Sequence, residues 1–200
     1  MMDEATYQNA VYLFEQGKYE QSFYEFKDIN DYANYKDTSS YLEKSEMIPY
    51  HHDVGETVKF GQFEWYIIEK TDDRCTLLCK DIVANRAYND QWTNIAWESC
   101  TLRKWLNGVF YNGFTDDEKA MIAKTKCENN HNSEYFTKGG NDTEDYIFLL
   151  SLDEAEAVDK SIRAIDSWWW LRSPGHLLKL SIILDTFISN KFQAAMLRLS

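Results

Sequence analysis

Two kinds of hydrophobic spacing divide the chain. Residues 3–46 carry apolar side chains at helical intervals, and Gly17 separates a stripe that ends at Phe14 from a second stripe that contains Phe26. Beyond residue 55 the apolar positions come in short runs separated by Gly, Asp and Asn, which is typical of strands and turns. The pattern predicts an α+β chain in three parts: a helical hairpin over 1–48, a linker over 49–55 and a mixed domain over 56–200.

The first part contains three expected helices. Gly17 allows a tight turn between the first two, and small Ser22 lets them approach closely. Asp37 is a candidate N-cap for a third helix that runs to about Glu46. The spacing is similar to one tetratricopeptide-type hairpin, and a generic αα-hairpin explains it equally well. Because one repeat cannot bury both of its faces, we expect it to dock on something else.

The mixed domain begins as a β-meander. Gly55–Glu69 predicts two strands around a turn at Gly61, and Arg74–Lys80 predicts a third strand. Ser99 is a candidate N-cap for a helix that ends near Gly108.

The second half of this domain alternates helices, a long loop and a short strand. Thr115 and Glu118 have the spacing of a capping box at the start of a helix. Residues 128–144 are rich in Asn, Gly and Asp and predict a loop. Tyr146–Leu150 predicts a short strand, and Leu152–Ala157 a helix with acidic side chains in its first turn.

Three consecutive tryptophans, Trp168–Trp170, precede Leu171, Arg172 and a Ser-Pro-Gly turn signal. Because consecutive side chains on a strand face opposite ways, the run predicts a strand that is buried on one face or both. Core packing explains the indoles better than a sugar-stacking platform does, since few polar residues lie nearby in the sequence. The tryptophans expected in the core are Trp65, Trp97, Trp105, Trp169 and Trp170.

Composition and charge restrict the classes of partner. Hydrophobic residues make up 44% of the chain and aromatic residues 16%, which is enough for a packed core. The net charge of −12 argues against nucleic acid and against an anionic membrane surface, and it leaves basic partners or cations open. No apolar run has the length of a membrane span, and the acidic start gives no signal peptide, so a cytoplasmic location is the default expectation.

Cysteine and histidine spacing gives little support for catalysis or a metal site. Cys75 and Cys79 lie four positions apart on an expected strand, about 13 Å at 3.3 Å per residue, too far for a disulfide. We expect the four cysteines to be buried thiols, with zinc or disulfide chemistry as the alternatives. No zinc-type histidine spacing or nucleophile signature is present, so we expect no metal, no cofactor and no enzymatic activity.

Two regions supply candidate binding residues. The oxygen-rich segment 139–145, with Asn141 and Asp142, suits either a calcium ion or a turn that uses these side chains for its own backbone. Arg172 suits either an ion pair with a carboxylate such as Glu98 or Asp153, or a guanidinium that faces a ligand. The candidate ligand-binding residues are therefore Asn141, Asp142 and Arg172, and the ligand, a protein or a small molecule, is open.

Residues 54–175 resemble a bacterial domain family of unknown function. The matching segments are Gly55–Gly61, Trp97–Asn107, Phe110-Tyr111, Gly139–Thr143, Phe148–Ala155 and Trp169–Gly175. The resemblance implies a C-type-lectin-like fold, with a small antiparallel sheet, two to three helices and long ligand-facing loops. That fold is shared with sulfatase-modifying enzymes, whose activity relies on late cysteines, and this chain has none after Cys127. The resemblance therefore favours a binding or interaction module, with a sulfatase-modifying type of enzyme as the alternative.

The tail departs from the family pattern. Residues 176–200 contain no Gly and no Pro, where the family usually continues with Gly- and Asn-rich hairpin strands. This predicts a shifted reading frame or a truncated tail, and such a member of the family would lack a competent site. Residues 177–188 fit either a helix or short strand-like segments.

Overall fold

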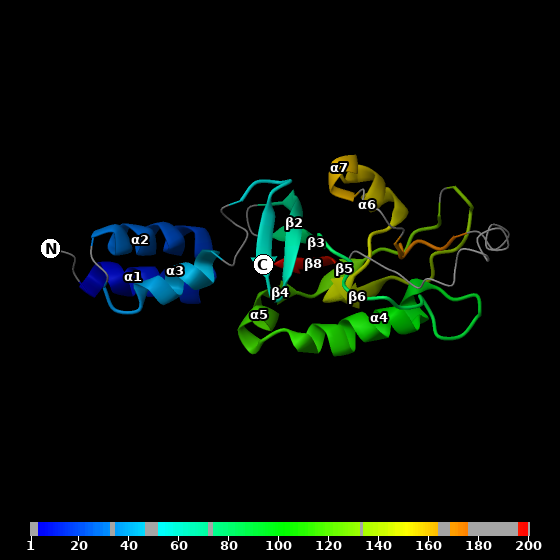
Figure 1. Ribbon diagram of the computed structural model, residues 1–200, viewed down its shortest axis with the longest axis horizontal. Helices are drawn as coiled ribbons and strands as arrows, with labels where there is room; N and C mark the ends of the chain where they lie inside the picture. Colours follow the sequence, from blue (N-terminus) through cyan, green and yellow to red (C-terminus); the bar gives the residue numbers. More distant parts are fainter. Residues whose placement is uncertain are drawn as a thin grey trace.

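The computed structural model describes residues 4–32, 35–46, 52–71, 74–132, 134–163, 169–175 and 196–199. The chain begins with three helices, and Figure 1 shows them at one end of a molecule whose remaining body mixes helices and strands. Each part has its own cluster of buried hydrophobic residues. The α+β class predicted from the sequence is confirmed.

The N-terminal part packs three helices, α1 (Glu4–Glu15), α2 (Tyr19–Tyr32) and α3 (Thr38–Glu46). Gly17 makes the turn between α1 and α2 with a φ of 73°, a conformation that costs glycine little. Ser22 is fully buried and its hydroxyl donates to the Ala10 carbonyl at 2.9 Å. The predicted hairpin is therefore confirmed, and a small side chain lies at the close contact between its helices.

One antiparallel sheet forms the middle of the body. Strands β1 (Thr57–Phe60), β2 (Phe63–Lys70) and β3 (Cys75–Cys79) follow one another as the predicted meander. The order continues through β8 (Met196–Leu199) to β4 (Ile122–Ala123), and β7 (Ile147–Phe148) also pairs with β8. A separate pair, β5 (Thr125–Cys127) and β6 (Thr143–Asp145), was not predicted. All five residues of β3 are buried, which accounts for the apolar run that included Cys75 and Cys79.

The end of the chain supplies a central strand. Leu199 of β8 is fully buried and pairs with Cys75 on one side and Ile122 on the other. Residues 196–199 of the atypical tail are therefore strand. The helical alternative for 177–188 lies outside the described residues, and the shifted reading frame stays a prediction.

Short helices surround the sheet. Helix α4 (Thr101–Trp105) continues through a π-helical turn at Leu106–Phe110, and α5 (Asp116–Met121) and α6 (Leu152–Ala157) follow, with α7 (Lys160–Arg163) after α6. The capping box of Thr115 and Glu118 is confirmed at the start of α5. Ser99 as the N-cap of α4 was wrong. Ser99 lies in a preceding 3-10 turn, and Cys100 caps α4 by accepting from the Arg103 amide through its Sγ.

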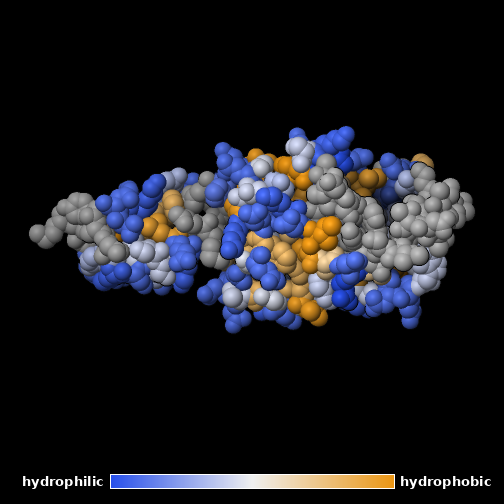
Figure 2. Space-filling model, in the orientation of Figure 1, coloured by the Kyte–Doolittle hydropathy of each residue, from blue (hydrophilic) through white to orange (hydrophobic). Residues whose placement is uncertain are grey.

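The tryptophans divide between the core and its edge. Trp65 and Trp97 are fully buried, whereas Trp105, Trp169 and Trp170 are half-buried and pack against the core. The strand predicted for the tryptophan run was wrong for residues 169–171, which are irregular, and Trp168 lies outside the described residues. The Trp170 indole instead donates to the Arg86 carbonyl at 3.2 Å, so it covers the loop that contains Arg86. Figure 2 shows hydrophobic side chains on the visible face gathering over the body rather than over α1–α3.

Candidate functional site

The site is built on the first turn of α6. Ser151 and Glu154 form a capping box: the Ser151 hydroxyl accepts from the Glu154 amide at 3.2 Å, and the Glu154 carboxylate accepts from the Ser151 amide at 2.8 Å. The Ser-x-x-Glu spacing that produces this box is readable in the sequence. The box fixes the Glu154 side chain at the helix start, where it meets Arg172.

Arg172 ties three segments together. Its guanidinium forms a bidentate ion pair with Glu154, with Nη2 2.7 Å from Oε1 and Nη1 on Oε2. The same two nitrogens donate to the carbonyls of Leu149 (2.8 Å) and Glu128 (3.2 Å), and the Arg172 amide donates to Leu150. The residue is only 3% exposed, and its Nε is buried with no hydrogen-bond partner among the described residues.

The ion pair sets the protonation of Glu154. Partial burial raises the pKa of this carboxyl group, but the Arg172 guanidinium and the donors of Ser151 outweigh burial and hold the pKa below its ordinary value. Glu154 therefore carries its negative charge at neutral pH, and the Arg172 charge is neutralised locally. The sequence-based candidates for this carboxylate, Glu98 and Asp153, were wrong. Glu154 takes the role because the capping box turns its side chain back toward the helix start.

The loop before β6 contributes a second group of residues to the site. Asn132 is 6% exposed, its Oδ1 accepts from the amides of Glu134 and Tyr135, and its Nδ2 donates to the Pro174 carbonyl at 2.9 Å. The Thr137 hydroxyl donates to the same carbonyl at 3.0 Å. Hydrogen bonds therefore brace the loop on the turn that follows Arg172.

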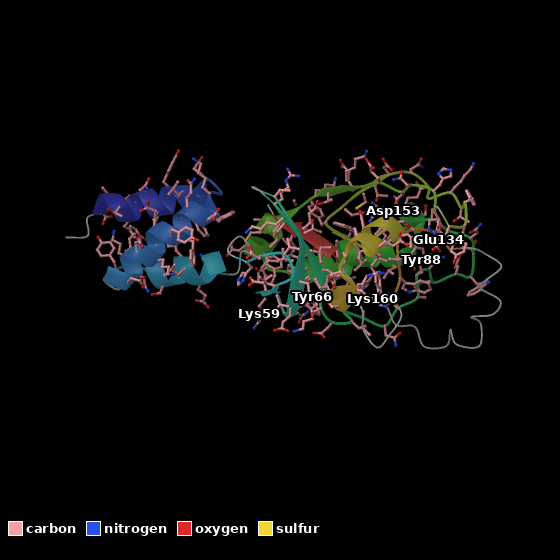
Figure 3. The ribbon with its side chains drawn as sticks, turned by 90° about the horizontal axis from the view of Figure 1, so that it is seen from above. Lys59, Tyr66, Tyr88, Glu134, Asp153 and Lys160 are labelled. Atoms are coloured by element: carbon pink, nitrogen blue, oxygen red, sulfur yellow. The ribbon has the colours of Figure 1, made fainter. Side chains whose placement is uncertain are left out.

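Between these elements lies a pocket of about 160 Å³, here named the polar pocket. Nine of its ten lining residues are polar or charged. The ten are Glu128, Asn130, His131, Asn132, Ser151, Leu152, Asp153, Glu154, Arg172 and Ser173. Asp153 is exposed, and among the described residues it has no hydrogen-bond or ion-pair partner. Figure 3 shows Asp153 and Glu134 toward the same end of the body, away from α1–α3.

Only one of the three predicted binding residues lines this pocket. Arg172 does, whereas Asn141 donates to Glu98 at 2.8 Å and Asp142 accepts from the Asn129 amide at 3.0 Å. Asp142 also lies 3.1 Å from Lys126, and both contacts lower the pKa of its carboxyl group. Asn141 and Asp142 therefore brace the loop in the way that a turn-forming segment does.

A second polar cluster is buried beside the pocket loop. Asp145 is 1% exposed and accepts from Arg103 Nε (2.7 Å), Trp97 Nε1 (3.0 Å) and the Thr143 hydroxyl (2.7 Å). No local pattern indicated this cluster, because its members come from separate elements of the fold. Its donors and acceptors satisfy one another, so it serves to join α4 to β6.

None of the four cysteines lines the polar pocket. All four are free and buried. Burial raises the pKa of the Cys79 and Cys127 thiols to about 12 and that of Cys100 above its ordinary value. These thiols are therefore protonated at neutral pH, and a protonated thiol is a poor nucleophile. Within the described part of the chain, no three His, Cys, Asp or Glu side chains are arranged to hold a metal ion, and no helix is long and apolar enough to cross a membrane.

Fold and site define an α+β domain that follows a helical hairpin and carries a small polar pocket among its loops. The chain belongs to the family described as a domain of unknown function (DUF6273), whose model matches residues 72–184. That match extends past Gly175, where the tail leaves the expected pattern. No curated protein and no solved structure matches the chain.

Proposed function

We propose that this domain is a non-enzymatic binding module whose polar pocket holds a positively charged group of its ligand. The observation that carries this proposal is the charge of the lining. Glu128, Asp153 and Glu154 contribute three carboxylates, and the one guanidinium, that of Arg172, is already paired with Glu154.

The remaining charge favours a cation. Lys126 lies 3.5 Å from Glu128, but the two side chains are 62% and 64% exposed, so water screens their attraction. Asp153 has no counter-charge among the described residues. Asp153 is exposed as well, so the attraction of one cation to its carboxylate is worth no more than about 1 kcal/mol. The net charge of −12 adds long-range attraction for a basic partner.

The size of the pocket favours one side chain over a whole small molecule. Pockets for drug-sized ligands span roughly 300–1,000 Å³. A volume of about 160 Å³ suits an ammonium or guanidinium head with a few methylenes. A lysine or arginine side chain of a protein partner fits this description.

The hydroxyl groups and thiols support a non-enzymatic role. The Ser151 and Ser173 hydroxyls accept from the amides of Glu154 and Leu152, which is helix-capping work. A sulfatase-modifying type of enzyme would need a reactive cysteine, and the buried thiols with raised pKa favour binding over that alternative.

The proposal includes a C-type-lectin-like fold for the body and a tetratricopeptide-like origin for the helical hairpin. A small antiparallel sheet, short helices and a long braced loop support a C-type-lectin-like arrangement of the body. The glycine turn and the close contact at Ser22 support a tetratricopeptide-like origin for α1 and α2. Both relations fit a module that presents a loop-built site to a partner.

The test is a titration of the full chain with a lysine analogue. N-acetyl-lysine methylamide and its uncharged counterpart N-acetyl-norleucine methylamide would be added while amide chemical shifts are followed by NMR. We expect shifts around Asp153 and Asn132 with the lysine probe only, weakening as salt is raised.

A matched pair of variants isolates the pocket charge. Asp153→Asn should weaken binding of the lysine probe at least threefold. Asp117→Asn is the control, because Asp117 is an exposed aspartate at the same position of a capping-box helix, α5. Equal binding of both probes, or equal losses in both variants, would refute the proposal.

A further inference from the structure

Phe136 stands out in the loop that begins at pocket residue Asn132. Its side chain is 87% exposed, and its backbone has a φ of 56°, in the left-handed region. The Phe136 amide donates to the Asn132 carbonyl at 2.8 Å, and the Asn132 amide donates to the Thr137 carbonyl at 2.9 Å. The loop is therefore closed by its own hydrogen bonds, and Phe136 directly precedes the closing residue Thr137.

Neither feature helps the chain to fold. The left-handed region is unfavourable for side chains with a Cβ, and a bulky residue there is an outlier. An exposed ring also gains no hydrophobic stabilisation. A glycine at this position would remove both costs, so the phenylalanine needs an explanation outside folding.

The ring and the pocket share their supports. Asn132 lines the pocket, and its backbone and side chain close the loop that presents Phe136. The Pro174 carbonyl accepts hydrogen bonds from the Asn132 and Thr137 side chains, and Pro174 directly follows pocket residue Ser173. A ligand in the pocket therefore lies next to a loop that its own hydrogen bonds hold in one conformation, which lowers the entropy cost of using the ring as a contact.

We infer that Phe136 is a preset aromatic anchor and that, with the polar pocket, it selects a basic peptide segment that carries an apolar residue next to its cationic side chain. This inference rests on the proposed function and adds the class of partner. Charge complementarity selects the occupant, because Arg172 neutralises Glu154 but leaves Glu128 and Asp153 in the lining, and the chain carries a net charge of −12. Phenylalanine is among the residues that are enriched at protein–protein interfaces.

Three peptides separate the two contacts. N-acetyl-leucyl-lysyl-leucinamide offers both, N-acetyl-glycyl-lysyl-glycinamide offers the cation alone, and N-acetyl-leucyl-glutaminyl-leucinamide offers the apolar groups alone. Each would be titrated into the full chain, with Kd measured by NMR. We expect the first to bind at least fivefold more tightly than the second, and the third to bind most weakly.

Variants of the anchor complete the test. Phe136→Gly should bring the first two peptides to within twofold of each other while Tm stays the same or rises. Phe136→Leu should keep part of the difference. Tyr24→Ala, which removes an exposed aromatic ring from α2, is the control and should leave the ratio unchanged.

Each result has one meaning. Failure of every lysine peptide to bind wild-type protein would overturn the proposed function. Binding of the lysine peptides with a ratio that Phe136→Gly does not change would overturn the anchor alone. Self-association of the wild-type chain in sedimentation velocity that Phe136→Gly abolishes would show that a second copy occupies the ring, which would also overturn it.

Discussion

Replacing Arg172 with methionine tests whether the buried ion pair holds the loops in place. The substitution keeps an unbranched side chain in the site and removes the guanidinium. Glu154 loses a bidentate partner, and the carbonyls of Leu149 and Glu128 lose their donors. We therefore expect Arg172→Met to destabilise the body while leaving α1–α3 intact.

The magnitude follows from burial. Removing one partner of a buried ion pair costs about 3–5 kcal/mol, because the other charge stays without compensation. The Glu154 side chain is 42% exposed, so water can reach its orphaned carboxylate and the cost falls toward the lower end. About 3 kcal/mol corresponds to a fall in Tm of roughly 6–12 °C for a chain of this length.

Urea unfolding followed by tryptophan fluorescence measures this change. The midpoint should fall and the m-value should stay constant. Arg86→Met is the control: Arg86 is exposed and lies 4.9 Å from the Trp105 ring, so its loss should cost less than about 1 kcal/mol. A loss for Arg172→Met no larger than that of Arg86→Met would refute the argument that the guanidinium is structural.

Four further predictions concern stability and reactivity. Folding lowers the pKa of Glu154 below its ordinary 4.5, so the ionised carboxylate stabilises the fold above pH 4.5. This contribution is lost as the pH falls through the lowered pKa. The urea midpoints of wild type and Glu154→Gln should therefore converge in acid. Gly139→Ala should destabilise the body by about 3 kcal/mol, since the new Cβ would lie 2.0 Å from a backbone oxygen, while Gly108→Ala, with open space, should be neutral in the same urea assay. Iodoacetamide should label less than one cysteine per protein molecule in the native state and all four in urea. Ready labelling of the native protein would contradict the burial of the thiols. A chain ended after Gly175 lacks β8, the partner of β3, β4 and β7, and should melt without a cooperative transition in circular dichroism.

Local patterns predicted most of the secondary structure. The capping box of α5, the glycine turn before α2 and the meander of β1–β3 each depend on residues close together in the sequence, and all were confirmed. The strand predicted at the tryptophan run failed. Aromatic residues favour strands only where a neighbouring strand pairs with them, and at residues 169–171 the indoles cover loops instead.

The candidate site shows the same division. Arg172 was recognisable as a charged residue in an apolar segment, and the Ser-x-x-Glu spacing at Ser151 was readable, but nothing local joins the two. Asn132 gave no signal, because its role depends on Pro174, which lies 42 residues further along the chain. The exposed, left-handed Phe136 was equally invisible, since the backbone conformation follows from the closed loop around it.

The sequence by itself determined the α+β class, the helical hairpin, the acidic character and the burial of the cysteines. Those properties follow from composition and short-range periodicity, which act without knowledge of distant partners. Only the tertiary structure decided that Glu154 pairs with Arg172, that the tail supplies a central strand and that a polar pocket includes Asn132 from the loop of Phe136. These features join residues far apart in the chain. The interactions that hold them together form only when folding brings those residues into contact.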